Sequence, residues 1–172
     1  MADHPPSSSV TRVRTPCIGV CSTVFGDSVC RGCKRFAHEV VNWNAYSDDE
    51  KDIVWRRLNS LLKLVVSNYF KVLDSSLLRQ GMDYQNLRFQ SELSPEGWVP
   101  DLLKAAGRQA IRYQDFGLQP LFDPASHSPR ELYDRISHEL YELSRAHLDR
   151  ARQAQRIPLL VEAVARELDT PS

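Results

Sequence analysis

All four cysteines of this 172-residue chain lie close together, at Cys17, Cys21, Cys30 and Cys33. Their spacing is C-x3-C-x8-C-x2-C, which is two close pairs joined by a short connection. Two such pairs can deliver four thiolates to a roughly tetrahedral site, and both a zinc ion and an iron–sulfur cluster accept that arrangement. The spacing therefore predicts one metal centre. Zinc is the first choice because it supplies folding energy to a segment with little core, and a cluster is the alternative.

The expected compartment also favours a metal over disulfides. The first ten residues, MADHPPSSSV, contain neither a basic stretch nor an apolar run, so they lack the pattern of a secretory signal. The most apolar run, LLKLVVSNYFKVL, is too short and too polar to cross a bilayer. We therefore expect a cytoplasmic protein without membrane contact, in a reducing environment. Redox-active thiols are the competing interpretation, but the βαβ context of C-x-x-C oxidoreductases is missing.

The residues beside the cysteines suit a thiolate site. Gly19 and Gly32 lie inside the two pairs, where a backbone that curls around a metal often needs positive φ or amides directed at sulfur. Three basic residues surround the second pair, namely Arg31, Lys34 and Arg35. We expect a helix to begin at Cys33, so that its N-terminus and these cations lower the thiol pKa and offset the thiolate charge.

Other residues of the segment have a structural and a functional interpretation. His38 could be an alternative ligand, but four thiolates already complete a tetrahedron, which favours a surface histidine. Glu39 has no acid or base partner nearby, so it is expected to support the site or to pair helices. Phe36 and Trp43 could stack on nucleotide bases, but they share a helical face with Cys33, which favours core packing.

Four motifs between Pro16 and Leu58 resemble a known bacterial family. They are PCIGVC, CRGCKR, HEVVNW and SDDEK, and they resemble the domain of unknown function 1289 (DUF1289), short proteins described as predicted iron–sulfur proteins. The matching positions are Cys17, Cys21, Cys30, Gly32, Cys33, Arg35, Glu39 and Trp43. The sequence departs from the family at Phe36 and His38, where Thr and Asp are usual, so no hydroxyl or carboxylate role carries over there.

The rest of the chain is expected to be mainly helical. Ser47 and Glu50 form a capping box that starts a long helix with a broad apolar stripe. The stripe comprises Val54, Trp55, Leu58, Leu61, Leu62, Val65, Val66, Tyr69 and Leu73. The cysteine segment is too small to cover it, so this helix is expected to bridge the segment and the C-terminal half.

The C-terminal half shows weaker signals. A short extended piece is expected over residues 84–89, and a third helix near Pro100. Ser128 and Glu131 form a second capping box, and Pro158 is expected to stop or kink the helix that follows, leaving a final helix beyond it. Residues 117–129 are expected to form a loop.

The sequence thus predicts a mainly α fold, with a small four-cysteine metal-binding module followed by a long helix packed with further helices. The predicted parts are a disordered tail over 1–14, the cysteine-rich module over 15–46 and a helical domain over 47–172. The expected supporting or partner-contacting residues are Gly32, Lys34, Arg35, Glu39 and Trp43.

Composition and motifs narrow the function without naming a process. The chain has 22 basic and 22 acidic residues, so its overall charge favours neither nucleic acid nor an anionic membrane. It lacks a glycine-rich phosphate loop, a G-x-S-x-G motif and an H-E-x-x-H motif, and no small-molecule substrate is evident. We expect a non-enzymatic module that contacts a protein, with RNA as a less favoured partner. An iron–sulfur redox or sensor protein is the alternative.

Overall fold

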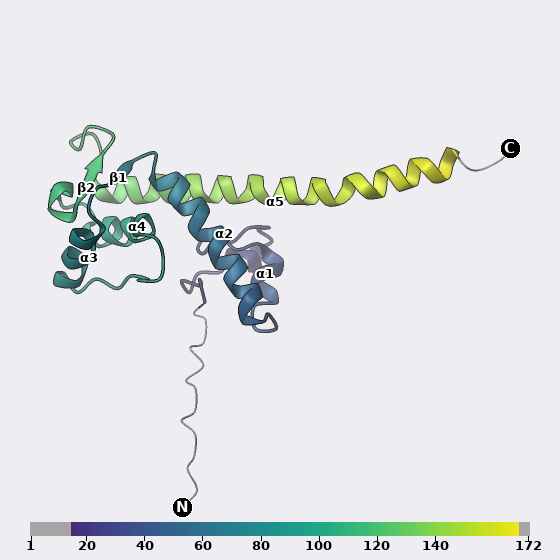
Figure 1. Ribbon diagram of the computed structural model, residues 1–172, viewed down its shortest axis with the longest axis horizontal. Helices are drawn as coiled ribbons and strands as arrows, with labels where there is room; N and C mark the ends of the chain where they lie inside the picture. The colour runs from purple at the N-terminus through teal and green to yellow at the C-terminus, as the bar shows by residue number, and fades with distance from the viewer. Residues whose placement is uncertain (1–14, 169–172) are drawn as a thin grey trace, which may run out of the picture.

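The computed structural model describes the backbone of residues 15–168 and the side chains of residues 15–155. The tail predicted over 1–14 lies outside the described residues. The chain is mainly helical, as predicted, and Figure 1 shows the order of its elements. They are η1 (Ser22–Phe25), α1 (Ala37–Val41), α2 (Asp48–Val66), β1 (Phe70–Val72), α3 (Ser75–Tyr84), α4 (Pro95–Ala106), η2 (Tyr113–Phe116), β2 (Leu118–Pro120) and α5 (Pro129–Leu168).

The long helix α5 runs along one side of the molecule, and the other elements lie against its first part (Figure 1). The second predicted capping box is confirmed, because the Glu131 amide donates to Ser128 Oγ and the Ser128 amide donates to the Glu131 carboxylate. The separate final helix predicted beyond Pro158 is wrong, since α5 continues as one helix to Leu168. A proline removes one backbone hydrogen bond, and a 40-residue helix retains its other turns.

The predicted start of α2 is also confirmed, but its predicted stripe is too long. The Ser47 amide donates to Glu50 at 2.7 Å, and Ser47 Oγ accepts from the Glu50 amide at 3.3 Å. The helix ends at Val66, and the chain turns into β1. Leu73, which was expected on the buried stripe, is 62% exposed, because the apolar spacing continued by chance past the end of the helix.

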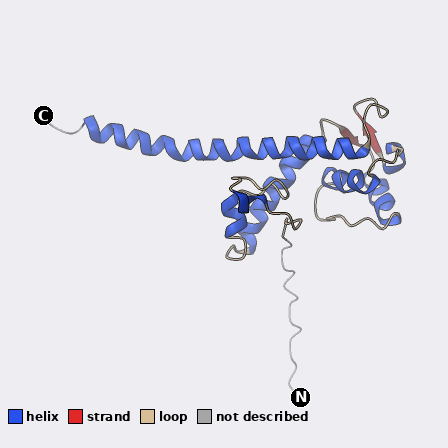
Figure 2. Ribbon diagram, turned by 180° about the vertical axis from the view of Figure 1, so that it is seen from behind, coloured by secondary structure: helices blue, strands red, loops and turns tan. Residues whose placement is uncertain are grey.

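A two-stranded sheet and two further helices complete the fold. Strands β1 and β2 pair antiparallel, with Phe70 opposite Pro120 (Figure 2). Strand β2 lies in the region that was predicted to be loop, whereas β1 replaces the predicted end of the long helix. Helix α3 replaces the start of the predicted extended piece at 84–89, and its N-cap is Asp74, whose carboxylate accepts from two backbone amides at 2.9 Å. Helix α4 begins at Pro95, earlier than predicted, and Pro100 lies within it.

The main hydrophobic core joins α2, α3, α4, α5 and the two strands. Its buried members are Leu61, Val65, Val66, Phe70, Leu78, Met82, Trp98, Val99, Leu102, Leu103, Tyr113, Leu118, Leu132, Ile136 and Leu140. None of these residues comes from the cysteine segment, which packs in two smaller clusters. Among the described helices, none combines the length and the apolarity that a membrane span requires.

Candidate metal centre

The second cysteine pair lies in a tight hairpin. Val29 and Phe36 form an antiparallel bridge, the Cys30 amide donates to the Arg35 carbonyl at 2.8 Å, and the Lys34 amide donates to the Cys30 carbonyl at 2.8 Å. Lys34 adopts a left-handed conformation with φ of 61°. The prediction that a helix begins at Cys33 is therefore wrong: the chain reverses at Lys34, and α1 begins only at Ala37.

Cys30 is the most enclosed thiol, at 1% exposed. Burial by itself would raise its pKa, but the backbone amides of Cys33, Ser22 and Gly32 are directed at the sulfur and lower the pKa to about 7. Burial raises the pKa of Cys33, and the nearby Arg35 only partly opposes this effect. The expectation of a lowered thiol pKa thus holds for Cys30 and is wrong for Cys33, which has no helix N-terminus beside it.

The first cysteine pair repeats the amide-to-sulfur geometry in a more open form. The Gly19 amide donates to Cys17 Sγ at 3.4 Å, and Gly19 has the positive φ, 87°, that the sequence suggested. Cys21 Sγ lies 3.0 Å from Thr23 Oγ1 and is half-buried, whereas Cys17 is exposed. Both pairs therefore present amides to the sulfur of their first cysteine.

Gly32 brings the two pairs into backbone contact. A Cβ atom added at this position would lie 2.7 Å from the Val20 carbonyl oxygen and 3.0 Å from the Ile18 side chain. Cys30 Sγ lies 3.7 Å from the same Val20 oxygen. Gly32 does not have positive φ, so it is required for close approach between the two cysteine pairs.

Two of the predicted supporting cations are buried beside the thiols. Lys34 is 6% exposed, and its Nζ donates to the carbonyls of Arg31 and Gly32 and to Ser137 Oγ of α5, at 2.6, 3.1 and 2.8 Å. Burial lowers its pKa, while the charges of the two nearest cysteines oppose the shift. Arg35 is 3% exposed, and its Nε donates to Cys33 Sγ at 3.3 Å.

A third cation, Arg57 on α2, was not predicted from the sequence. Its Nη2 lies 2.6 Å from Glu39 Oε2, and its guanidinium lies 3.8 Å from the ring centroid of Phe36. Burial lowers its pKa, and Glu39 and Cys33 oppose that shift. Arg57 lies close in sequence to Val54 and Leu58 of the apolar stripe, where a charged side chain needs a partner, and this position could have indicated a role for it.

Glu39 and Trp43 contact these cations directly. The Glu39 carboxylate is 6% exposed, accepts from the Phe36 amide at 2.8 Å and pairs with Arg57, so it links α1 to α2. The Trp43 ring is buried, and the Arg35 guanidinium lies 4.6 Å from its centroid.

The cysteine segment is attached to both α2 and α5. Trp43 packs with Val54 and Leu58 of α2, as the sequence predicted for the bridging helix. On the other side, Val29 and Phe36 pack against Leu148 and Tyr141 of α5, which the sequence did not predict. The segment therefore lies between two helices that also belong to the main core (Figure 1).

The structure brings the cysteines near one another without closing a site. The Cys30 and Cys33 side chains contact each other, Cys21 is half-buried, and the Cys17 side chain is at the surface. Among the described residues, no three His, Cys, Asp or Glu side chains converge as an ion would require. His38 is exposed and lies against the Phe36 ring, at 5.7 Å between centroids. The four-cysteine metal site is therefore not established by this geometry.

The fold and the site describe a mainly helical protein with a cysteine-rich N-terminal segment backed by buried cations. Residues 15–61 match the model of a family described as protein of unknown function (DUF1289). This match confirms the resemblance seen in the sequence, and it covers the cysteine segment, α1 and the first part of α2. No curated protein matches the chain, and no solved structure matches it.

Proposed function

We propose that Cys17, Cys21, Cys30 and Cys33 together bind one metal centre, with zinc as the first choice, and that this centre orders a non-enzymatic module that contacts a protein partner. The observation that carries the proposal is an excess of buried positive charge around the thiols. Its support comes from the electrostatics, the backbone geometry and the exposed surface of the segment.

The charges near Cys33 do not balance if the thiols stay neutral. Lys34, Arg35 and Arg57 bring three positive charges, and Glu39 is the one carboxylate that pairs with them among the described side chains. The Nη1 atoms of Arg35 and Arg57 are both buried without a hydrogen-bond partner. Buried charges without counter-charge are costly. Four thiolates around a divalent zinc ion carry two net negative charges, which match the two unbalanced cations.

The backbone is also suited to thiolates. Amides are directed at Cys17 and Cys30, and hydrogen bonds to sulfur stabilise the charged form of a thiol. Gly32 lets the two pairs approach each other. A closed site would need the exposed Cys17 side chain to turn toward the other three. A bound zinc ion would cross-link the two pairs and supply folding energy to the segment.

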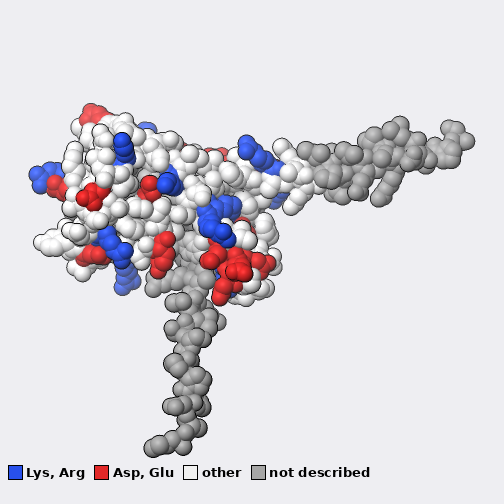
Figure 3. Space-filling view, viewed as in Figure 1, with Lys and Arg blue, Asp and Glu red and all other residues white. Residues whose placement is uncertain are grey.

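The segment presents an apolar surface rather than a basic one. Lys34 and Arg35 are buried, so of the predicted basic cluster only Arg31 remains exposed for a nucleic-acid phosphate. In contrast, Ile18, Val20, Val24 and Phe25 are between 58% and 92% exposed. On the face shown in Figure 3, Lys and Arg side chains are interspersed with Asp and Glu. These features favour a protein partner with an apolar contact surface over RNA.

An iron–sulfur cluster is the second candidate, favoured by the DUF1289 match and by the same charge balance, because cysteine-ligated clusters also carry net negative charge. The test is anaerobic purification followed by metal analysis and absorbance spectroscopy. We expect a colourless protein with one zinc per chain, and single Cys→Ser variants that lose most of the metal. A brown protein with broad absorbance near ~400 nm would establish the cluster instead. Full metal content in any of the four variants would refute the four-ligand site.

The partner proposal is tested separately with Phe25→Asp, which changes the most exposed aromatic residue of the surface. A protein captured by the wild type should be lost in Phe25→Asp while the metal content is unchanged. Val41→Asp in α1, also at an exposed apolar position, is the control for added charge elsewhere on the segment. Equal capture by wild type and Phe25→Asp would exclude this surface.

A further inference from the structure

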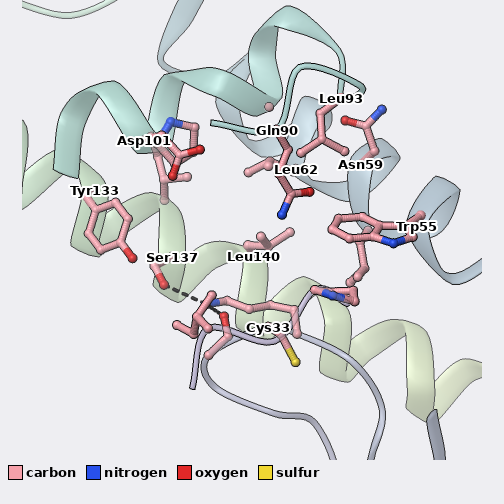
Figure 4. Close-up of a pocket in the computed structure, with 18 residues that line it drawn as sticks. Cys33, Trp55, Asn59, Leu62, Gln90, Leu93, Asp101, Tyr133, Ser137 and Leu140 are labelled. Atoms are coloured by element: carbon pink, nitrogen blue, oxygen red, sulfur yellow. Dashed lines mark hydrogen bonds between the residues drawn. The ribbon is translucent and has the colours of Figure 1, made fainter. Parts of the chain in front are cut away.

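A cavity of about 180 Å³ lies between the cysteine segment, α2, α4, α5 and the loop before α4 (Figure 4). It shares a wall with the candidate metal centre through Gly32, Cys33 and Lys34, but the Cys33 sulfur points away from it. Most of its wall is aliphatic or aromatic and comes from Trp55, Leu58, Leu62, Leu93, Ile136 and Leu140. An apolar hollow built from five parts of the chain with a few convergent polar groups has the form of a small-ligand site.

Among the described residues, Lys34 is the one basic side chain that lines this cavity, and its ammonium protons are already used in hydrogen bonds. Its ammonium has three protons, and each has an acceptor: the carbonyls of Arg31 and Gly32, and Ser137 Oγ. An anionic ligand would therefore have to displace one of these hydrogen bonds. The hydrogen bonds of Lys34 therefore argue against an anionic ligand in this cavity.

The opposite wall of the cavity contains a hydrogen-bond acceptor, the Asp101 carboxylate. Asp101 on α4 is partly buried, and among the described side chains none forms an ion pair or hydrogen bond with its carboxylate. Burial raises its pKa to about 6, with the charge of Lys104 opposing the shift, so the carboxylate is mostly ionised at pH 7.5. Figure 4 shows Asp101 and Cys33 on opposite sides of the cavity, with the Gln90 amide directed into the space between them.

We propose that this cavity binds a small primary amine whose apolar body is no larger than one aromatic ring, with its ammonium group held by the Asp101 carboxylate. The Gln90 side-chain carbonyl can accept a second ammonium hydrogen, and the Trp55 ring and the leucines contact the body. The size limit follows from the volume, since a dry cavity of about 150 Å³ accommodates benzene. This inference is independent of the metal proposal.

The test is binding of three ring compounds of similar size by ligand-observed NMR, using the full chain at pH 7.5. The probes are benzylamine, benzyl alcohol and benzoate, which differ mainly in the charge of the polar group. We expect benzylamine to bind with a Kd in the ~1 mM range, as befits eight non-hydrogen atoms, and at least tenfold more tightly than the alcohol or the anion.

Two variants separate recognition by Asp101 from non-specific association. Asp101→Asn keeps the shape and removes the charge, so it should weaken benzylamine binding about tenfold and leave benzyl alcohol unchanged. Leu62→Trp should fill the cavity and weaken all three probes. Asp83→Asn, an exposed carboxylate on α3, is the control and should change nothing. Equal binding of the three probes, unchanged benzylamine binding in folded Asp101→Asn, or no binding to the wild type would overturn the proposal.

Discussion

Substitution of Gly32 by alanine tests whether the two cysteine pairs form one site. The added Cβ would lie 2.7 Å from the Val20 carbonyl oxygen, closer than such atoms pack, and this neighbour is backbone that cannot rotate away. Gly32 lacks positive φ, so alanine brings no conformational strain of its own. The perturbation therefore acts by pushing the second pair away from residues 18–20.

The expected magnitude follows from overpacking. Extra atoms in a well-packed contact typically cost ~1–3 kcal/mol. If closing the site around zinc requires this contact, the same free energy is lost from metal binding, which corresponds to a roughly 5- to 150-fold weaker affinity. Ile18 contributes a second close contact at 3.0 Å, so the double variant Ile18→Ala/Gly32→Ala should recover only a small part of the loss.

The assay is a competition titration of zinc against a chromophoric chelator, with the wild type, Gly32→Ala and the double variant compared at one pH. Val41→Ala, an exposed position of α1 in the same segment, is the matched control and should stay within about twofold of the wild type. A Gly32→Ala protein with wild-type zinc affinity would show that metal binding does not depend on contact between the pairs. Full rescue by Ile18→Ala would show that the side chain, not the Val20 carbonyl, sets the cost.

Three further predictions test the charges and the packing. Arg35→Met removes the donor to Cys33 Sγ and should weaken zinc binding about 10- to 100-fold in the same titration, whereas Arg31→Met at an exposed site should change it less than about threefold. Because burial raises the pKa of Asp101 to about 6, its charged form destabilises the folded state once the pH rises above this value. Asp101→Asn should therefore raise the unfolding free energy by ~1 kcal/mol at pH 7.5, after allowance for solvent screening, and should leave it unchanged at pH 4. Urea denaturation at the two pH values measures this difference. Leu148→Ala should lower hydrogen-exchange protection at residues 28–37 by ~2–4 kcal/mol, and the exposed Leu64→Ala should not.

Local sequence patterns predicted the features of this fold that depend on neighbouring residues. The capping boxes at Ser47 and Ser128 place the starts of α2 and α5 correctly, because each box needs only residues three positions apart. The prediction of a helix from Cys33 was wrong because periodic apolar spacing does not reveal the left-handed turn at Lys34 that makes a hairpin. Asp74, the N-cap residue of α3, is a local signal of the same kind, and it would have predicted the start of this helix.

Features built from distant parts of the chain could not be predicted in this way. Arg57 joins the cysteine segment only because α2 carries it against Glu39, 18 positions earlier in the sequence. Lys34 and Ser137 are 103 positions apart, and their hydrogen bond depends on how α5 crosses the segment. The cavity beside Asp101 is formed by five parts of the chain together. The spacing of the cysteines predicted a ligand set, but the buried cations that favour a charged site are a tertiary property.

Removal of the proposed metal should loosen the cysteine segment and leave the rest of the fold in place. Among the residues whose side chains the structure describes, the main core contains none before Leu61, so α2 to α5 do not depend on residues 15–46 for their burial. The segment itself is held by two small clusters and by Lys34, Arg35 and Arg57, whose charges would lose their counter-charge with the metal. A chelator should therefore raise hydrogen exchange over residues 15–46 while the exchange of α3 and α4 stays unchanged, with the chelator-treated wild type and the Cys30→Ser variant behaving alike. Equal loss of protection in α3 and α4 would show that the metal stabilises the whole chain, and unchanged exchange over 15–46 would show that the segment folds without it.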